Sequence, residues 1–411
     1  MRQVDICDIA ERLQVPPLPE RWKAFAEQTE ADAVWFLPEQ LQKFQDETDL
    51  FPTRLRDVLV GAEAVWANEP LRQYCVILSR AMDDREAFME ELAQIRLPQA
   101  KEGESTLAYD YMGLFALLPQ AVKTMAQLRQ RGVPEEIILA TFRALEGTLA
   151  ATEARLGRPM FNDSYFGWTQ HFLNGVILRI GRLEFHRIPN MYGADFAVFR
   201  SDAGEYRLLA VRGTYDQNGR CKKGDAAPEP ADIAVSYTET ETYFEGNAIT
   251  EKGMICRETV RLPKASWKKI CDPSSPALTV HIPIGPGMTP ENVHASYAKA
   301  LEVMESCYPE FSFPVLHCSS WLMDTQLADM LPAESNMVRF QSDYLHGNTV
   351  HVDSGVFSFL FTYPYSRDDL PGLPERTTLE RKMKQHLLSG QHCYDQVGVI
   401  PVELLKEKIL K

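Results

Sequence analysis

The sequence has no apolar run long enough to cross a membrane. Its most apolar patch, residues 112–118, is much shorter than the roughly 20 residues that a membrane-spanning helix needs. Residues 1–15 alternate charged with apolar side chains and lack the apolar core of a signal peptide. We therefore expect a cytoplasmic protein with no membrane partner.

The sequence also lacks paired cysteine motifs and an excess of positive charge. Its eight cysteines are scattered without a C-x-x-C pair, which predicts free thiols in place of a disulfide framework or a zinc site. The 43 basic residues are outnumbered by 57 acidic ones, giving a net charge of −14. This balance argues against a nucleic-acid partner, because phosphate backbones require a basic surface.

The composition is that of an ordinary globular protein, 45% hydrophobic and 24% charged. A chain of 411 residues is expected to form two or three domains. We expect a helical N-terminal domain over residues 1–150 and a mixed α/β domain over residues 151–411, led by helices up to residue 180. No fixed-period repeat indicates a solenoid.

Helical apolar spacing dominates the first half and period-2 alternation begins at Gly181. The predicted helices are residues 20–29, 38–46, 53–67, 71–82, 84–95, 107–118, 121–131, 134–156 and 164–180. The predicted strands that follow are residues 182–188, 195–201, 206–212, 237–246 and 255–262, and residues 267–270 lead into the next strand. In the tail we expect a helix over 379–388, a loop over 390–398 and a final helix over 402–410.

A glycine-rich turn follows the most strongly patterned strand of the second half, residues 276–283. The turn reads Ile284-Gly285-Pro286-Gly287-Met288, and Thr289 and Pro290 then suit the N-cap and first position of a helix. A helix N-terminus presents free amides and a positive dipole end, so this turn is a candidate anion site. An ordinary turn of an α/β domain is the alternative.

Further elements are predicted downstream of this helix. We expect strands over residues 313–319, 337–344 and 355–362, and a short helix capped by Asp324. In the strand over 337–344, alternation places Arg339 and Gln341 on one face, where they could orient a substrate or, for the arginine, pair with a carboxylate.

This order of strand, glycine turn, helix, diverging strand and closing strands resembles the acyl-CoA-binding half of the GNAT superfamily of N-acyltransferases. More specifically, the chain resembles a bacterial acyltransferase family that joins a helical N-terminal domain to a GNAT-like C-terminal domain. The segments that carry the resemblance are residues 181–185 (GRLEF), 281–285 (HIPIG), 318–324 (CSSWLMD), 331–332 (LP) and 335–341 (SNMVRFQ).

The resemblance implies an α+β fold with a central, largely antiparallel sheet, and an enzyme that transfers an acyl group from acyl-CoA to an amine or hydroxyl of a small-molecule acceptor. It implies that two strands splay apart around the pantetheine arm, with Pro283 causing the splay. The cofactor-binding residues would be Ile282, Pro283, Ile284, Gly285, Gly287, Met288 and Thr289. The family pattern has Gln or Arg three residues before the first glycine, whereas this chain has Ile282.

Direct attack of an amine on a thioester needs a base for the amine and an acid for the leaving thiolate. His281 is the candidate base, with a histidine bonded within the sheet as the alternative. Glu184 is a second candidate base. Cys318 and Ser320 are candidate acids, or they fill space where their strand meets a helix.

Three other interpretations of the second half remain open. Cys318 with a histidine such as His281 or His317 could form a cysteine hydrolase, although no orienting acid is visible. His346, His351 and Asp353 could hold a metal, but the Gly-Asn pair between them is typical of a turn, and we expect no metal. Finally, the fold could bind acyl-CoA or another small ligand without catalysis.

Overall fold

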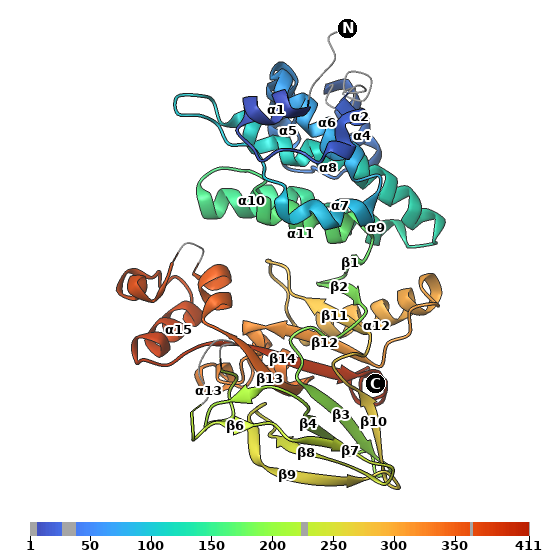
Figure 1. The fold of residues 1–411 in the computed structure, drawn as a ribbon, viewed down its shortest axis with the longest axis vertical. Helices are drawn as coiled ribbons and strands as arrows, with labels where there is room; N and C mark the ends of the chain where they lie inside the picture. The colour runs from blue at the N-terminus through green and yellow to red at the C-terminus, as the bar shows by residue number, and fades with distance from the viewer. Residues whose placement is uncertain (1–5, 27–37, 223–228, 362–364, 411) are drawn as a thin grey trace. The chain divides into compact units, whose positions relative to one another are not determined.

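The computed structural model describes residues 6–26, 38–222, 229–361 and 365–410 (Figure 1). The chain divides into two compact units, Met1–Arg179 and Ile180–Lys411. Residue 150, where we expected the boundary, lies within a helix. In the described part of the chain, no helix is long and apolar enough to cross a bilayer.

The first unit is helical, as predicted. Its core is α8 (Leu107–Gln130), in which every residue from Tyr111 to Leu118 is buried, and α5, α6 and α11 pack against it. The other helices and their bounds are α1 Ile6–Leu13, η1 Glu20–Trp22, α2 Lys23–Ala26, α4 Pro38–Thr48, α5 Leu55–Ala67, α6 Glu69–Ala81, α7 Arg85–Glu91, η3 Leu92–Gln94, α9 Glu135–Phe142, α10 Ala144–Leu156 and α11 Asp163–Leu173.

Several predicted helix boundaries in this unit were wrong. The helices expected over 107–118 and 121–131 are the single helix α8, which continues through Pro119. The helix expected over 134–156 is divided into α9 and α10. The helix expected to reach residue 180 ends at Leu173, because Gly175 adopts a left-handed φ of 63° that stops it. The predicted helix over 20–29 extends beyond the described residues.

The second unit contains a six-stranded sheet in the order β1-β2-β11-β12-β14-β13. Its strands are β1 Ile177–Ile180, β2 Leu183–Ile188, β11 Ala277–His281, β12 Val315–Ser320, β13 Leu345–Val352 and β14 Tyr394–Pro401. Only β11 and β12 are parallel among the pairs with a described register, and α12 (Pro290–Cys307) connects them. The predicted largely antiparallel sheet is therefore confirmed.

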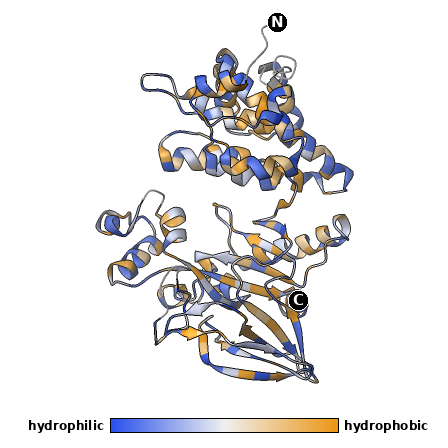
Figure 2. Cartoon of the chain, viewed as in Figure 1, coloured by the Kyte–Doolittle hydropathy of each residue, from blue (hydrophilic) through white to orange (hydrophobic). Residues whose placement is uncertain are grey.

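A second antiparallel sheet, in the order β10-β3-β4-β8-β7 with β9 beside β8, packs against the first. The two sheets meet in one apolar core, where Phe196 and Val198 of β3 join Val315, Val397 and Val399. Figure 2 shows apolar residues interleaved with polar ones along these strands. The strands are β3 Phe196–Ser201, β4 Tyr206–Ala210, β7 Tyr237–Glu239, β8 Tyr243–Ile249, β9 Ile255–Pro263 and β10 Trp267–Cys271, and a separate pair is β5 Thr214–Tyr215 with β6 Ile233–Ala234.

The C-terminal elements differ most from the expectation. Residues 337–344 do not form a strand: they lie mostly in helix α14 (Asn336–Ser342), because Ser335 accepts a hydrogen bond from the Val338 amide and caps a helix there. The strand expected over 355–362, which ends outside the described residues, contains the π-helix η5 (Val356–Leu360). The loop expected over 390–398 contains most of β14, which pairs with both β12 and β13.

The remaining helices of this unit are short. They are η4 Trp321–Met323, α13 Leu327–Met330, η6 Arg367–Gly372, α15 Thr378–Leu388, α16 Val402–Leu404 and η7 Leu405–Ile409. The predicted helix over 379–388 is confirmed by α15, and the helical end of the chain by α16 and η7.

The close contact between the two sheets predicts that a larger side chain at Gly347 destabilises the protein. A Cβ added at Gly347 would lie 2.0 Å from Cε1 of Phe196, whereas a Cβ at Gly372 meets nothing within 4 Å. We expect Gly347→Ala to lower the free energy of unfolding by about 1–3 kcal/mol through overpacking. Gly372→Ala is the control and is expected to change it by less than about 0.5 kcal/mol. Equal unfolding midpoints for the two variants in denaturant would contradict the described packing.

Candidate functional site

Strands β11 and β12 separate partway along their length. They share two ladder pairs, Leu278 with Leu316 and Thr279 with His317. Beyond these, His281 pairs only with β2, opposite Glu184, while residues 318–320 pair only with β14. The result is a fork between two backbone edges, and its opening lies at the C-terminal ends of both strands.

The start of the fork corrects one expectation. Pairing with β12 is lost at Val280, which lies three residues before Pro283. Each strand continues to pair on its other side, and Pro283 follows the end of the strand at His281, so the proline lies beyond the point where the pairing ends.

The sheet has an apolar and a polar face at the fork. Alternation places Phe185, Val280 and Cys318 on the face where Tyr297 of α12 packs on Phe185, with ring centroids 6.5 Å apart. The opposite face carries Glu184, His186, Thr279, His281 and His317. The histidines and Glu184 at the fork are thus gathered on the face away from α12.

Two histidines meet on the polar face. Nε2 of His281 lies 3.3 Å from Nδ1 of His186, and both side chains are partly exposed. Glu184 is the ladder partner of His281 and is only 6% exposed. The structure therefore brings the predicted residues His281 and Glu184 together and adds His186. The sequence signal for His186 was its position two residues after Glu184, which gives both side chains the same face.

The glycine turn has the conformation that its sequence requires. Gly285 and Gly287 have φ values of 145° and 89°, where L-residues are strained. Thr289 caps α12 by accepting from the Asn292 amide, with Pro290 in the first turn, as predicted. Asn292 also donates to the carbonyl of Gly287 over 3.0 Å. Ile284 projects from the turn and is 76% exposed.

A hollow beside this turn contains two cations that sequence reasoning missed. It is lined by Gly181, Arg182, Pro286, Gly287, Asn292, Ala295, Ser296 and Lys299. Nη2 of Arg182 donates to the carbonyl of Gly285 over 2.9 Å, and Lys299 contacts Glu302 over 2.8 Å. Arg182 reaches the turn from the β1–β2 connection, about a hundred residues earlier in the chain. It brings a guanidinium to the glycine turn.

The other two predicted catalytic residues lie elsewhere. Cys318 is 1% exposed on the apolar face, and burial raises its pKa to about 12. The thiol is therefore neutral and separated from the histidine pair by the sheet. Ser320 is partly exposed at the end of β12, where its hydroxyl accepts from the Leu322 amide and caps η4.

The predicted substrate-binding pair does not share a sheet face. Arg339 and Gln341 lie on helix α14, so the expected alternation was wrong. Gln341 is buried and donates to the carbonyls of Leu322 and Asp324, a structural role that joins α14 to η4. Arg339 is exposed. The pKa of Glu291 in the first turn of α12 is lowered mainly by hydrogen bonds from its own backbone amide and from Thr289, with a smaller contribution from the charge of Arg339.

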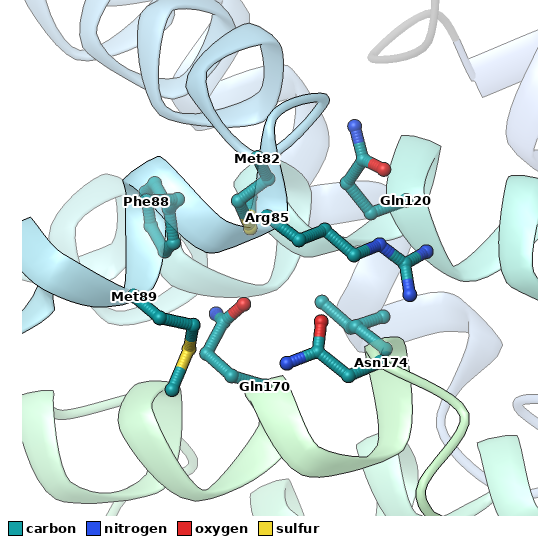
Figure 3. Close-up of a pocket in the computed structure, with 8 residues that line it drawn as sticks. Met82, Arg85, Phe88, Met89, Gln120, Gln170 and Asn174 are labelled. Atoms are coloured by element: carbon teal, nitrogen blue, oxygen red, sulfur yellow. The ribbon is translucent and has the colours of Figure 1, made fainter.

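The proposed metal site and the hollow in the helical unit are weaker candidates for a functional site. The described residues contain no group of three or more His, Cys, Asp or Glu that could hold a metal. Asp353 instead accepts from Arg367 and His392, each over 2.7 Å, and the side chain of His351 lies outside the described part. In the helical unit, Figure 3 shows a hollow between α7, α8 and α11 with room for about one water molecule. Its Arg85 donates to the Thr124 hydroxyl.

The family of the chain follows from its match to two known domains. Residues 40–175 match the N-acyltransferase N-terminal domain, and residues 177–400 match the GNAT-like C-terminal domain. The second match spans more than half of the 411 residues. The chain belongs to the family of the GNAT-like C-terminal domain. The fork and the glycine turn both lie within this GNAT-like domain.

Solved structures with the same fold cover nearly the whole chain. An acyltransferase in complex with decanoyl-CoA and teicoplanin is 18% identical, with a TM-score of 0.59, and the match covers 97% of this chain and 99% of that one. An acyltransferase in complex with CoA and 10C-teicoplanin gives the same values. An acyltransferase mutant in complex with octanoyl-CoA is 17% identical over the same shares, with a TM-score of 0.60. No curated protein matches the chain.

The burial of Cys318 predicts that its thiol is protected from alkylation in the folded protein. We expect iodoacetamide at pH 8 to modify the exposed Cys7 and to leave Cys318 unmodified in the folded protein, because a buried thiol with a pKa near 12 has almost no thiolate. Peptide mass mapping after denaturation reports both sites. Rapid loss of the Cys318 thiol would restore the cysteine hydrolase as a candidate.

Proposed function

We propose that the chain transfers an acyl group from acyl-CoA to an amine or hydroxyl of a small-molecule acceptor. The fork between β11 and β12 carries this proposal. The two facing backbone edges beyond the last β11–β12 ladder pair would offer amide and carbonyl groups to an extended, amide-containing chain such as the pantetheine arm. The structural neighbours that hold decanoyl-CoA and octanoyl-CoA support the same class of co-substrate.

The hollow beside the glycine turn would hold the phosphates of the co-substrate. It combines the N-terminus of α12 with Arg182 and Lys299, so a helix dipole and two cations favour the same negative charge. Of the predicted cofactor-binding residues, Gly285, Gly287, Met288 and Thr289 supply the turn and the helix cap. Ile282, Pro283 and the exposed Ile284 connect this turn to the end of β11, where the arm would enter the fork.

The histidine pair would accept the proton of the attacking group. One nitrogen of the His281–His186 contact must be unprotonated to accept the hydrogen bond, so the pair contains a neutral imidazole that can act as a base. The nearby Glu184 carboxylate would stabilise the imidazolium that forms. Attack on the thioester carbonyl then breaks the carbon–sulfur bond and releases CoA as the thiolate.

Ser320 is the proposed acid for this thiolate. Its oxygen accepts from the Leu322 amide, so its own hydrogen remains for donation at the free edge of β12. The acceptor is proposed only as a small molecule with an amine or hydroxyl. One structural neighbour contains teicoplanin, which supports a small-molecule acceptor without naming the one used here.

Ligand-dependent melting tests the proposal. CoA, acetyl-CoA and decanoyl-CoA are titrated with ATP and NAD as controls. A ligand at 100 times its dissociation constant stabilises the native state by about 2.7 kcal/mol, which raises the melting temperature. We expect a rise with the CoA compounds alone, followed by thiol release when amines are supplied. No rise with any CoA compound would overturn the proposal, and binding without thiol release would favour a non-catalytic binding protein.

Charge reversal at the turn tests the phosphate site. Gly287→Glu places a carboxylate where the phosphates are proposed, and we expect it to weaken CoA binding at least tenfold, about 1.4 kcal/mol. Gly287→Ala introduces the same backbone strain at a φ of 89° without the charge and is the matched control. If the two variants lose affinity equally in calorimetric titration, the strain explains the loss and the turn is not the phosphate site.

Removal of the base tests the histidine pair. We expect His281→Gln to lower kcat by about 10² to 10⁴, the usual contribution of a general base, while the dissociation constant for CoA stays within about twofold. His386→Gln, on helix α15, is the control histidine substitution. An unchanged kcat in His281→Gln would assign the base to another group, with Glu184→Gln as the next variant.

A further inference from the structure

Two buried side chains are joined at the base of the fork. Thr279 and His317 are the last ladder pair that β11 and β12 share, and both are fully buried. The Thr279 hydroxyl lies 3.0 Å from Nδ1 of His317. A side-chain hydrogen bond therefore connects the two strands at the point where their backbone pairing ends.

The imidazole of His317 is also fixed on its other side. Nε2 lies 3.1 Å from the carbonyl of Tyr192, and the Tyr192 ring packs edge-on against the imidazole with centroids 5.0 Å apart. A carbonyl can only accept, so Nε2 carries the hydrogen and Nδ1 accepts from Thr279. Burial lowers the pKa of His317 to about 4, so the ring is neutral at pH 7.

The Tyr192 backbone is itself held in place. The adjacent residues Met191 and Gly193 hydrogen-bond to Pro273 and to the side chain of Asn348, which is 1% exposed on β13. Asn348 also accepts from the Asp195 amide over 2.9 Å. The position of His317 is thus set by groups outside the two strands that it joins.

We propose that Thr279, His317 and the Tyr192 carbonyl form a clasp that sets the opening of the fork and so positions the thioester arm of the co-substrate. This inference rests on the proposed function. The clasp residues are positioning residues: they lie beneath the fork, and neither the histidine pair nor the hollow includes them. A fork held by only two ladder pairs can close or widen, and polar bonds at its base fix one separation.

Two ligands can test separately the binding of the phosphate end and the binding of the pantetheine arm of the co-substrate. CoA spans both the hollow and the fork, whereas adenosine 3′,5′-bisphosphate carries phosphates and no pantetheine arm. If the clasp positions the arm, its removal should weaken CoA and leave the bisphosphate unchanged. A structural defect in the domain would weaken both ligands.

Thr279→Val removes the hydroxyl with little change in shape, and Thr279→Ser retains it as the matched control. We expect Thr279→Val to raise the dissociation constant for CoA about tenfold, the effect of one lost positioning contact, with the bisphosphate within about twofold. Relative to the wild-type value, the kcat of Thr279→Val should fall further than the kcat of Thr279→Ser. Equal affinities of Thr279→Val and wild type for CoA, or a parallel loss for both ligands, would overturn the clasp.

His317→Asn provides a second variant, because the shorter amide can still accept from Thr279 while it loses the reach to Tyr192. We expect it to weaken CoA but not the bisphosphate, as Thr279→Val does, and the double variant to add little to either single change. Fully additive losses would overturn the clasp as one unit. If wild-type protein bound the bisphosphate but no CoA, the proposed function itself would fail, which is a different outcome from any of these.

Discussion

The separation of two parallel strands is the constraint on which the rest of the GNAT-like domain depends. β11 and β12 share only two ladder pairs, while each continues to pair on its outer side, β11 with β2 and β12 with β14. A pair of strands that share the full ladder would leave no backbone groups for a ligand. The antiparallel strands β2 and β14 hold β11 and β12 in place on their outer sides. The fork between β11 and β12 leaves their inner backbone edges facing each other.

Side chains that alternate along the strands give the fork one apolar face and one polar face. Residues on one face pack on α12 and are apolar, while the other face begins in the core shared with the second sheet and becomes polar toward the fork. His281 and His186 lie at this polar end, and the clasp lies between them and the core. The gradient from apolar to polar along one face leaves His281 and His186 partly exposed at the open end of the fork.

The glycine turn, the N-terminus of α12 and the cation Arg182 come from parts of the chain far apart in sequence. The turn and the helix cap are local, because glycine and the Thr-Pro pair determine them. Arg182 is brought to the turn by the pairing of β2 with β11. For the proposed phosphate site, this arrangement would supply a cation to the turn, where the resemblance to GNAT enzymes implies a Gln or Arg at the position of Ile282.

The sequence by itself determined the helical first half, the strands β2, β3, β4, β9, β11 and β12, the capped helix α12 and the family, because apolar periodicity and turn chemistry are local properties. It misassigned α14 and η5, where short alternating segments could not be told from helices until Ser335 acted as a cap. Only the tertiary structure decided the fork, the His281–His186 contact, the place of Arg182 and the burial of Cys318. Each of these depends on which strands become neighbours and in which register, and a single strand's sequence does not contain that information.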